Sequence, residues 1–428
     1  MKPKQQIDSF IIALFIATLP VFILSLGHAS GIFYALSIVS ATICITRVGG
    51  WSATLADWNR YRWLAAGLFG MMFVIVIVML AEQRVLGAAF ERSIRIGVGT
   101  FVILGACLSL KPDWLRQSIW GIGLAALVAA AQAWWFAWPD FKRPEEVPEY
   151  NIVSYGNLNL LVTVIFAFSF GWQLTRHRRT EFFIKALLVL IGFSGFIATQ
   201  TRTGWLAVPF FILIAVMFFK HAFSAKKLVG IFVAAIIIAA GIFATNDNLR
   251  KRTHEGISEF RECVTNPVAY SSVCIRLQLW RASWEMFKQD PVMGVGGADR
   301  FVIELEKLTE RNIVSKRVIE DGFEEPHNEM LHMMASYGTL GLIALLLIYL
   351  SPGVMFARRL SRSDVPEIRV AAAMGLSVCV GFWVFGWTDV MFRGMRTLGF
   401  YAVTVAWLLA LSDPVFLKRE SFAQQNAG

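Results

Sequence analysis

The sequence has little charge: only 16% of its 428 residues are Asp, Glu, Lys or Arg, against roughly 25% in ordinary soluble domains. Hydrophobic residues make up 56% of the chain. They recur in runs of roughly 17–20 residues, each long enough to cross a hydrocarbon core of about 30 Å as a helix. The scarcity of charge excludes an ordinary soluble protein, and the runs predict an all-α polytopic membrane protein.

The apolar runs predict about twelve transmembrane helices. Their approximate ranges are 10–26, 31–46, 63–81, 94–110, 118–137, 152–172, 182–199, 203–219, 228–244, 329–356, 370–388 and 396–412. No small-residue cleavage site separates the first run from the second. We therefore expect the first run to remain as an uncleaved helix rather than to be removed as a signal peptide.

Basic residues are unevenly divided between alternate loops. One side holds Lys2, Lys4, Arg47, Arg60, Arg62, Lys111, Arg116, Arg176, Arg178, Arg179, Lys220, Lys226, Lys227, Arg358, Arg359, Arg362, Arg369, Lys418 and Arg419. The positive-inside rule places these loops and both termini in the cytoplasm, and an even number of spans agrees. The net charge of +10 follows from this topology, so we expect no nucleic-acid partner.

One long polar stretch, residues 245–328, interrupts the apolar pattern and is expected to face the periplasm. It divides the chain into spans 1–9 (1–244), a large periplasmic loop or cap (245–328), and spans 10–12 with a cytoplasmic tail (329–428). Loops longer than about 12–15 residues are uncommon and usually functional. Two helical stripes within it are expected to pack against the membrane domain: Leu277, Trp280, Trp284 and Phe287, and then Phe301, Leu305 and Leu308.

Cysteine is scarce, and two of the five cysteines, Cys263 and Cys274, lie in this loop. An oxidising periplasm permits a disulfide between them, but two free thiols fit the sequence equally well. No Cys/His spacing resembles a zinc site. The outward acidic residues are scattered or accompanied by arginines, whereas metal sites need clustered carboxylates. We expect neither a metal nor a cofactor.

Ionisable residues are nearly absent from the middles of the spans, where proton relays would need them. Those that enter the membrane domain lie at outward helix ends, and Arg202 is one. Arg202 is either a snorkelling arginine that meets lipid phosphate or a phosphate clamp, because guanidinium binds phosphate oxygens in pairs. Arg276, with Arg281 on the same expected helix, offers the same chemistry or an ordinary salt bridge with the loop's carboxylates.

His327 follows Pro326 at the start of a span, so we expect it in the first helical turn. The helix dipole there favours a neutral imidazole that can accept a proton, whereas Glu324 and Glu325 oppose this effect. The sequence does not rank the two. A purely structural histidine is the alternative, and we expect His332, five residues later, to lie in the core.

The order and spacing of these motifs resemble the O-antigen ligases and their polymerase relatives. The resemblance covers residues from about 190 to 400. It is carried by the large outward loop and by Thr201-Arg-Thr-Gly-Trp205, Arg276-x-x-x-Trp280, Asp290-Pro-x-x-Gly-x-Gly296 and His327-Asn328. The family often has Ser-Arg-Gly where this chain has Thr-Arg-Thr-Gly, which shifts the arginine by one residue relative to the glycine.

The resemblance implies a glycosyltransferase of the Gram-negative inner membrane. Its donor is a glycan on undecaprenyl diphosphate, its acceptor in the ligases is the lipid A–core oligosaccharide, and it needs no ATP or metal. It implies that Arg202 and Arg276 bind the diphosphate and that His327 lies near the acceptor hydroxyl. Two further residues are expected at the substrate: Asn328, beside His327, and Asp389, which would orient the histidine or bind sugar. We also assign Arg281 to substrate binding.

Two alternative functions remain at this point. An O-antigen polymerase would use the same donor with a second lipid-linked glycan as acceptor. A lipid or glycan transporter would need polar residues at the membrane midplane, and the apolar span centres argue against it.

Overall fold

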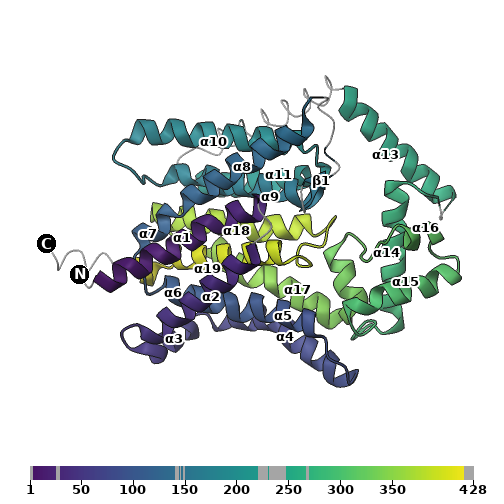
Figure 1. The fold of residues 1–428 in the computed structure, drawn as a ribbon, viewed down its shortest axis with the longest axis horizontal. Coiled ribbons are helices and arrows are strands. Elements are labelled where there is room, and N and C mark those ends of the chain that lie inside the picture. Colours follow the sequence, from purple (N-terminus) through teal and green to yellow (C-terminus); the bar gives the residue numbers. More distant parts are fainter. Residues whose placement is uncertain are drawn as a thin grey trace.

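The computed structural model describes residues 3–25, 29–139, 144, 146–147, 150–219, 230, 247–266 and 269–418. The described secondary structure is helical except for one antiparallel pair of two-residue strands, β1 (Glu146–Val147) and β2 (Tyr150–Asn151). The membrane-spanning helices run side by side, and a group of shorter helices covers one end of the bundle (Figure 1). The predicted fold class, an all-α polytopic membrane protein, is confirmed.

Within the described residues, nine helical segments are long and apolar enough to cross a membrane. They contain α1 (Pro3–Ser25), α2 (Ala29–Thr46), α4 (Arg62–Ala81), α7 (Pro112–Gln117) continuing into α8 (Ile119–Ala137), α9 (Ile152–Phe168) with η2 (Ser169–Gly171), α10 (Arg178–Ala198), α11 (Arg202–Phe219), α17 (Glu329–Arg362) and α18 (Pro366–Phe385). Each of the nine matches a predicted span.

The remaining three predicted spans have different outcomes. The last forms α19 (Met395–Leu411), an apolar helix of 17 residues. The span predicted at 94–110 is a composite of α5 (Gly87–Ile94), a π-helical turn η1 (Arg95–Gly99) and α6 (Thr100–Cys107). The span predicted at 228–244 lies outside the described residues apart from residue 230.

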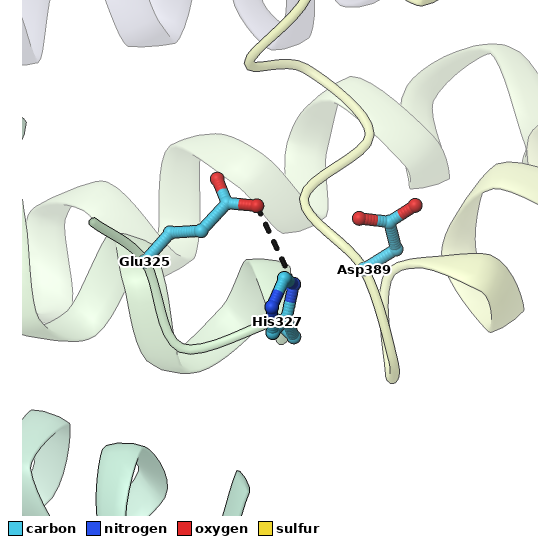
Figure 2. Close-up of side chains that lie close together, drawn as sticks. All are labelled: Glu325, His327 and Asp389. Atoms are coloured by element: carbon cyan, nitrogen blue, oxygen red, sulfur yellow. Dashed lines mark ion pairs between the residues drawn. The ribbon is translucent and has the colours of Figure 1, made fainter. Parts of the chain in front are cut away.

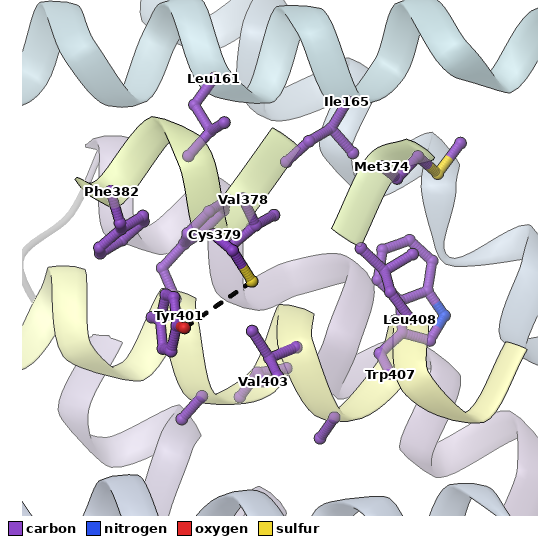
Figure 3. Close-up of a cluster of buried hydrophobic side chains, with 14 of the residues drawn as sticks. Leu161, Ile165, Met374, Val378, Cys379, Phe382, Tyr401, Val403, Trp407 and Leu408 are labelled. Carbon is purple, nitrogen blue, oxygen red and sulfur yellow. Dashed lines mark hydrogen bonds between the residues drawn. The ribbon is translucent and has the colours of Figure 1, made fainter. Parts of the chain in front are cut away.

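The centre of the bundle is a packed apolar core shared by α9, α18 and α19. Figure 3 shows side chains from these helices meeting there, among them Leu161, Ile165, Met374, Val378, Phe382, Val403 and Leu408. The polar tips in this core have partners: Tyr401 donates to the carbonyl oxygen of Ile348 at 2.7 Å and Trp407 to that of Leu115 at 2.8 Å. A bilayer offers no water to replace such bonds, so pairing within the protein is required.

The end of the bundle opposite the short helices carries a network of ion pairs. Arg47 and Arg60 contact Asp57 at 2.9 and 2.8 Å, and Arg60 also lies 3.4 Å from Asp413. Asp57 belongs to α3 (Gly50–Asn59), a short helix between α2 and α4 that the sequence analysis did not anticipate. The network joins residues from loops that the charge pattern assigned to one side.

The short helices at the other end are α13 (Asp247–Thr265), α14 (Ser272–Gln289), η3 (Ala298–Arg300), α15 (Phe301–Glu310) and α16 (Lys316–Glu320). We call them the cap. A disulfide between Cys263 and Cys274 joins α13 to α14, which decides between the two alternatives that the sequence left open. The cap has an apolar core of its own, built from Ile275, Leu279, Ala282, Met286, Phe301, Leu305, Leu308, Val314 and Val318, with Ala335 of α17 against it.

The cap core confirms that one predicted stripe is buried and contradicts the other. Phe301, Leu305 and Leu308 are buried, although in the core of the cap itself rather than only against the membrane domain. The stripe from Leu277 to Phe287 does not form the buried face of α14, because Trp284 is 47% exposed. The buried face contains alanine, serine and glutamine as well as apolar residues, so hydropathy alone selected the wrong side of the helix.

A break in the helical hydrogen bonds of α17 frees backbone groups that bond to the cap. Gly338 has φ 62° and ψ −154°, which interrupts the helical hydrogen bonds. The freed groups pair with residues 291–297 of the cap: Val295 and Gly297 donate to the carbonyls of Ala335 and Ser336 at 2.8 and 2.9 Å, and Thr339 donates to that of Pro291 at 2.9 Å. Residues 291–297, which include the glycines of the Asp290–Gly296 motif, therefore dock the cap against α17.

Candidate active site at the junction of cap and membrane helices

Two connecting segments meet where the cap joins the bundle. Residues 324–328 lead from the cap into α17, and residues 386–394 join α18 to α19. Figure 2 shows Glu325 and His327 of the first segment beside Asp389 of the second, with His327 between the two carboxylates. One donor atom of each of the three side chains lies within 4.8 Å of the others. The structure thus brings together two residues, His327 and Asp389, that the sequence analysis selected separately.

His327 lies just before α17 and not in its first turn, which corrects the expectation from Pro326. Its φ is +48°, a conformation uncommon outside glycine. The helix begins at Glu329 because Asn328 is its N-cap, and the side-chain oxygen of Asn328 accepts a hydrogen bond from the Leu331 N–H at 3.1 Å. The Asn328 amide also donates to the Trp387 carbonyl at 3.1 Å. Both ends of the Asn328 side chain are therefore engaged within the protein, and its role in substrate binding stays a prediction.

The surroundings of His327 favour its neutral form. Burial lowers the pKa of the imidazole; Asp389 opposes this effect, while the nearby guanidinium groups of Arg276 and Arg393 add to it. The neutral form is the one that accepts a proton. The sequence analysis left the helix dipole and the two glutamates unranked, and burial, which it did not consider, is the largest cause.

Glu325 is buried and contacts both His327 and Arg393. Its carboxylate lies 3.5 Å from His327 Nδ1 and 3.0 Å from Arg393 Nη1. Arg393 also pairs with Glu324. Burial raises the pKa of Glu325 to about 7 despite the opposing charge of Arg393. The sequence analysis treated Glu325 only as a charge that acts on His327 and did not include it among the site residues.

Asp389 is only 5% exposed and is held by two donors. The Ser154 hydroxyl of α9 donates to one carboxylate oxygen, and the Val390 N–H donates to the other at 2.9 Å. Ser154 is 235 residues from Asp389 in sequence, and no motif marked it. This contact ties the site to a central span.

Arg276 and Arg202 approach the site from the cap and from the start of α11. Asp389 and Arg202 are the charges that act most on the Arg276 guanidinium, whose pKa burial lowers. Arg202 is exposed and lies under α13, since a Cβ on Gly256 would be 3.8 Å from its Nη1. Arg281 is also exposed, but it lies about 140° around α14 from Arg276, so one face of α14 cannot present both.

The two carboxylates and the imidazole include the donor types that divalent cations use. The fold gathers Glu325 and Asp389 beside His327, so these acids are not scattered, but arginines accompany them, which is the other arrangement that the sequence analysis expected. A cation would compete with Arg393, which already pairs with Glu325, and would meet the positive charge of Arg276. The expectation of a metal-free site stays a prediction.

Comparison with known proteins adds a family to this geometry. Residues 186–346 match the family model described as O-Antigen ligase; the match contains Arg202, Arg276 and His327 but ends before Asp389. An uncharacterized protein of Haemophilus influenzae is 24% identical over 235 residues, which cover 54% of this chain and 57% of that protein. The family match, with the motifs it contains, supports a relationship of residues 186–346 to the O-antigen ligase/polymerase superfamily.

Proposed function

We propose that this protein is an O-antigen ligase. It transfers glycan from undecaprenyl diphosphate to the lipid A–core oligosaccharide at the periplasmic face of a Gram-negative inner membrane. The observation that carries the proposal is the meeting of His327, Asp389 and Arg276 in one buried junction, inside a chain whose residues 186–346 match the O-antigen ligase family model. The transfer completes a step of lipopolysaccharide biosynthesis.

The proposed orientation places the cap in the periplasm and both termini in the cytoplasm. The division into 1–244, 245–328 and 329–428 follows from it. Two observations support the orientation. The arginines of the ion-pair network lie at the end opposite the cap, as the positive-inside rule expects of cytoplasmic loops. The cap carries the disulfide, which is typical of an oxidising compartment.

Arg202 and Arg276 are proposed to bind the donor diphosphate. Guanidinium groups keep their charge and offer paired donors to phosphate oxygens. Negative charge grows on the diphosphate as it leaves, so donors already fixed in place stabilise the transition state by about 3–4 kcal/mol each. Burial of Arg276 at the junction strengthens this effect, because the local dielectric is lower than that of water.

His327 is proposed to be the general base for the acceptor. The acceptor hydroxyl oxygen forms a bond to the anomeric carbon, and the bond from that carbon to the diphosphate oxygen breaks. Its electron pair leaves with the diphosphate, and the hydroxyl proton passes to His327. Such proton transfer is worth about 10²–10⁴-fold in rate. Glu325, 3.5 Å from Nδ1, and Asp389 stabilise the imidazolium that forms, so no ATP, cofactor or metal is needed.

The test separates the ligase from the polymerase by its acceptor. Purified protein is given the lipid-diphosphate glycan together with either lipid A–core or a second lipid-linked glycan. A ligase extends lipid A–core, and a deletion strain accumulates lipid-linked glycan while its lipid A–core stays bare. Extension of the lipid-linked glycan alone would identify a polymerase, and no product with either acceptor would favour transport and refute the proposal.

A further inference from the structure

We infer that Glu329 is a positioning residue for this reaction. Its buried side chain holds the segment that carries Asp389 and Arg393 against His327, and it does so as a hydrogen-bond acceptor rather than as a charge. The inference rests on the proposed function, because it assigns Glu329 to the same site. Neither the motifs of the sequence nor the family match draws attention to this residue.

Glu329 is the first residue of α17, and its side chain is completely buried. One carboxyl oxygen, Oε2, accepts the backbone N–H of Phe392 at 3.0 Å. The backbone N–H of Glu329 itself donates to the carbonyl oxygen of Gly386 at 2.7 Å. Glu329 therefore bonds to the 386–392 segment at both ends, through its backbone at Gly386 and through its side chain at Phe392.

Two groups that act on His327 depend on this segment, one within it and one directly after it. Asp389 lies between the two anchor points, and Arg393 follows Phe392 directly. Asp389 raises the pKa of the imidazole and Arg393 lowers it, and Arg393 also holds Glu325 at 3.0 Å. The hydrogen bond from Phe392 to Glu329 therefore helps to hold both charged groups at their distances from His327.

The hydrogen bonds of Glu329 indicate whether its charge or its acceptor oxygen holds the segment. Oε1 has no hydrogen-bond partner among the described residues, and no Lys or Arg in that part of the chain forms an ion pair with the carboxyl. The contacts that the side chain makes are with the backbone N–H groups of Phe392 and Met391, and they need an acceptor oxygen at the correct reach. Glutamine supplies that oxygen without a charge, whereas aspartate keeps the charge and is one methylene too short.

The test compares Glu329→Gln with Glu329→Asp in the purified ligation assay. We expect Glu329→Gln to retain most of the wild-type kcat. We expect Glu329→Asp to lose tenfold to about 100-fold in kcat, the range that a displacement of about 1 Å can cost. The KM for the donor should stay unchanged in both, because Arg202 and Arg276 belong to other elements. Asp389→Ala combined with Glu329→Asp should be little worse than Asp389→Ala alone, since both changes disturb one group.

Glu181 supplies the matched control. It is a buried glutamate at the opposite end of the bundle, and it holds its neighbouring segment by accepting the Thr175 N–H at 2.7 Å. Glu181→Asp should alter stability without altering kcat of the folded enzyme. Normal kcat in Glu329→Asp, or a greater loss in Glu329→Gln than in Glu329→Asp, would overturn the inference. An inactive wild-type protein would instead refute the proposed function.

Discussion

The indole N–H of Trp280 donates a hydrogen bond to the carbonyl oxygen of Pro326 at 3.0 Å. Trp280 lies one helical turn after Arg276 on α14, and Pro326 directly precedes His327. This contact therefore fixes the cap helix that carries a proposed phosphate ligand relative to the segment that carries the proposed base. The glycan donor and the acceptor hydroxyl must come within bonding distance of each other. The two elements proposed to bind them must therefore be held in a fixed relation.

Trp280→Phe should separate these elements without removing the aromatic ring. The variant loses one buried hydrogen bond, worth about 0.5–1.5 kcal/mol of stability. It should lose about 10²-fold in kcat if the two substrates shift by about 1 Å. Trp284→Phe, on the exposed side of the same helix, is the control and should behave as wild type. Equal activity of the two variants would show that the Trp280 contact has no part in catalysis.

Arg276→Lys and Arg202→Lys test geometry against charge. Lysine keeps the positive charge but cannot offer paired donors in one plane. We expect each variant to accumulate normally and to lose most ligation in a cell-based assay of glycan attachment. Arg311→Lys, on the exposed surface of the cap, is the matched control. Near-normal attachment by the Arg276 and Arg202 variants at equal protein level would contradict the diphosphate role.

Chelation tests the cluster of Glu325, His327 and Asp389. Because Arg393 already pairs with Glu325 and arginines are proposed to bind the diphosphate, product formation should continue in EDTA. The measurement is the initial rate of the purified enzyme before and after chelation. If the rate vanished and returned with Mg²⁺ or Mn²⁺, the cluster would be a metal site.

His327→Ala and His327→Gln distinguish a base from a binding residue. Both should abolish transfer at saturating acceptor, because glutamine can hydrogen-bond a hydroxyl but cannot take its proton at neutral pH. Donor binding should persist in both variants, since the arginines hold the diphosphate. His177→Gln, an exposed histidine remote from the site, controls for the substitution. Substantial activity of His327→Gln would reduce His327 to a residue that positions the acceptor.

The parts of this molecule that the sequence predicted are those with a local signal. Long apolar runs predicted the spans, and the scarcity of charge at membrane depth made Arg202, His327 and Asp389 conspicuous, whereas Arg276 was selected from the expected helix of the long loop and the family motif. The capping role of Asn328 was also within reach of the sequence, because asparagine before a helix is a common N-cap.

The parts that the sequence did not predict depend on contacts between distant segments. Ser154 reaches Asp389 across 235 residues. Glu329 looks like any acidic residue in a first helical turn until the 386–392 segment is seen against it. The buried face of α14 was misjudged because Gln278 and Ser283 are buried and bonded, which a hydropathy pattern reads as exposed.

The pH dependence of the reaction should follow the neutral form of His327. Burial lowers the pKa of His327 below its ordinary value of about 6.5. The base is active when deprotonated, so the steep acid limb of kcat/KM that belongs to His327 should lie below about pH 6.5, while protonation of Glu325 near pH 7 changes the rate only modestly. Asp389→Asn removes the charge that raises this pKa, so the acid limb of the Asp389→Asn profile should move to still lower pH, even if its maximum is reduced.

The control for this profile is Asp299→Asn, because Asp299 is an exposed cap residue paired with Arg84. It should leave the acid limb in place. The measurement is kcat/KM between about pH 5 and pH 8, a range that spans the ordinary histidine pKa, at constant ionic strength. An acid limb that moved upward in Asp389→Asn would mean that the titrating group is not His327. A limb unchanged by Asp389→Asn would mean that Asp389 does not act on the base, because a carboxylate this close must favour the imidazolium.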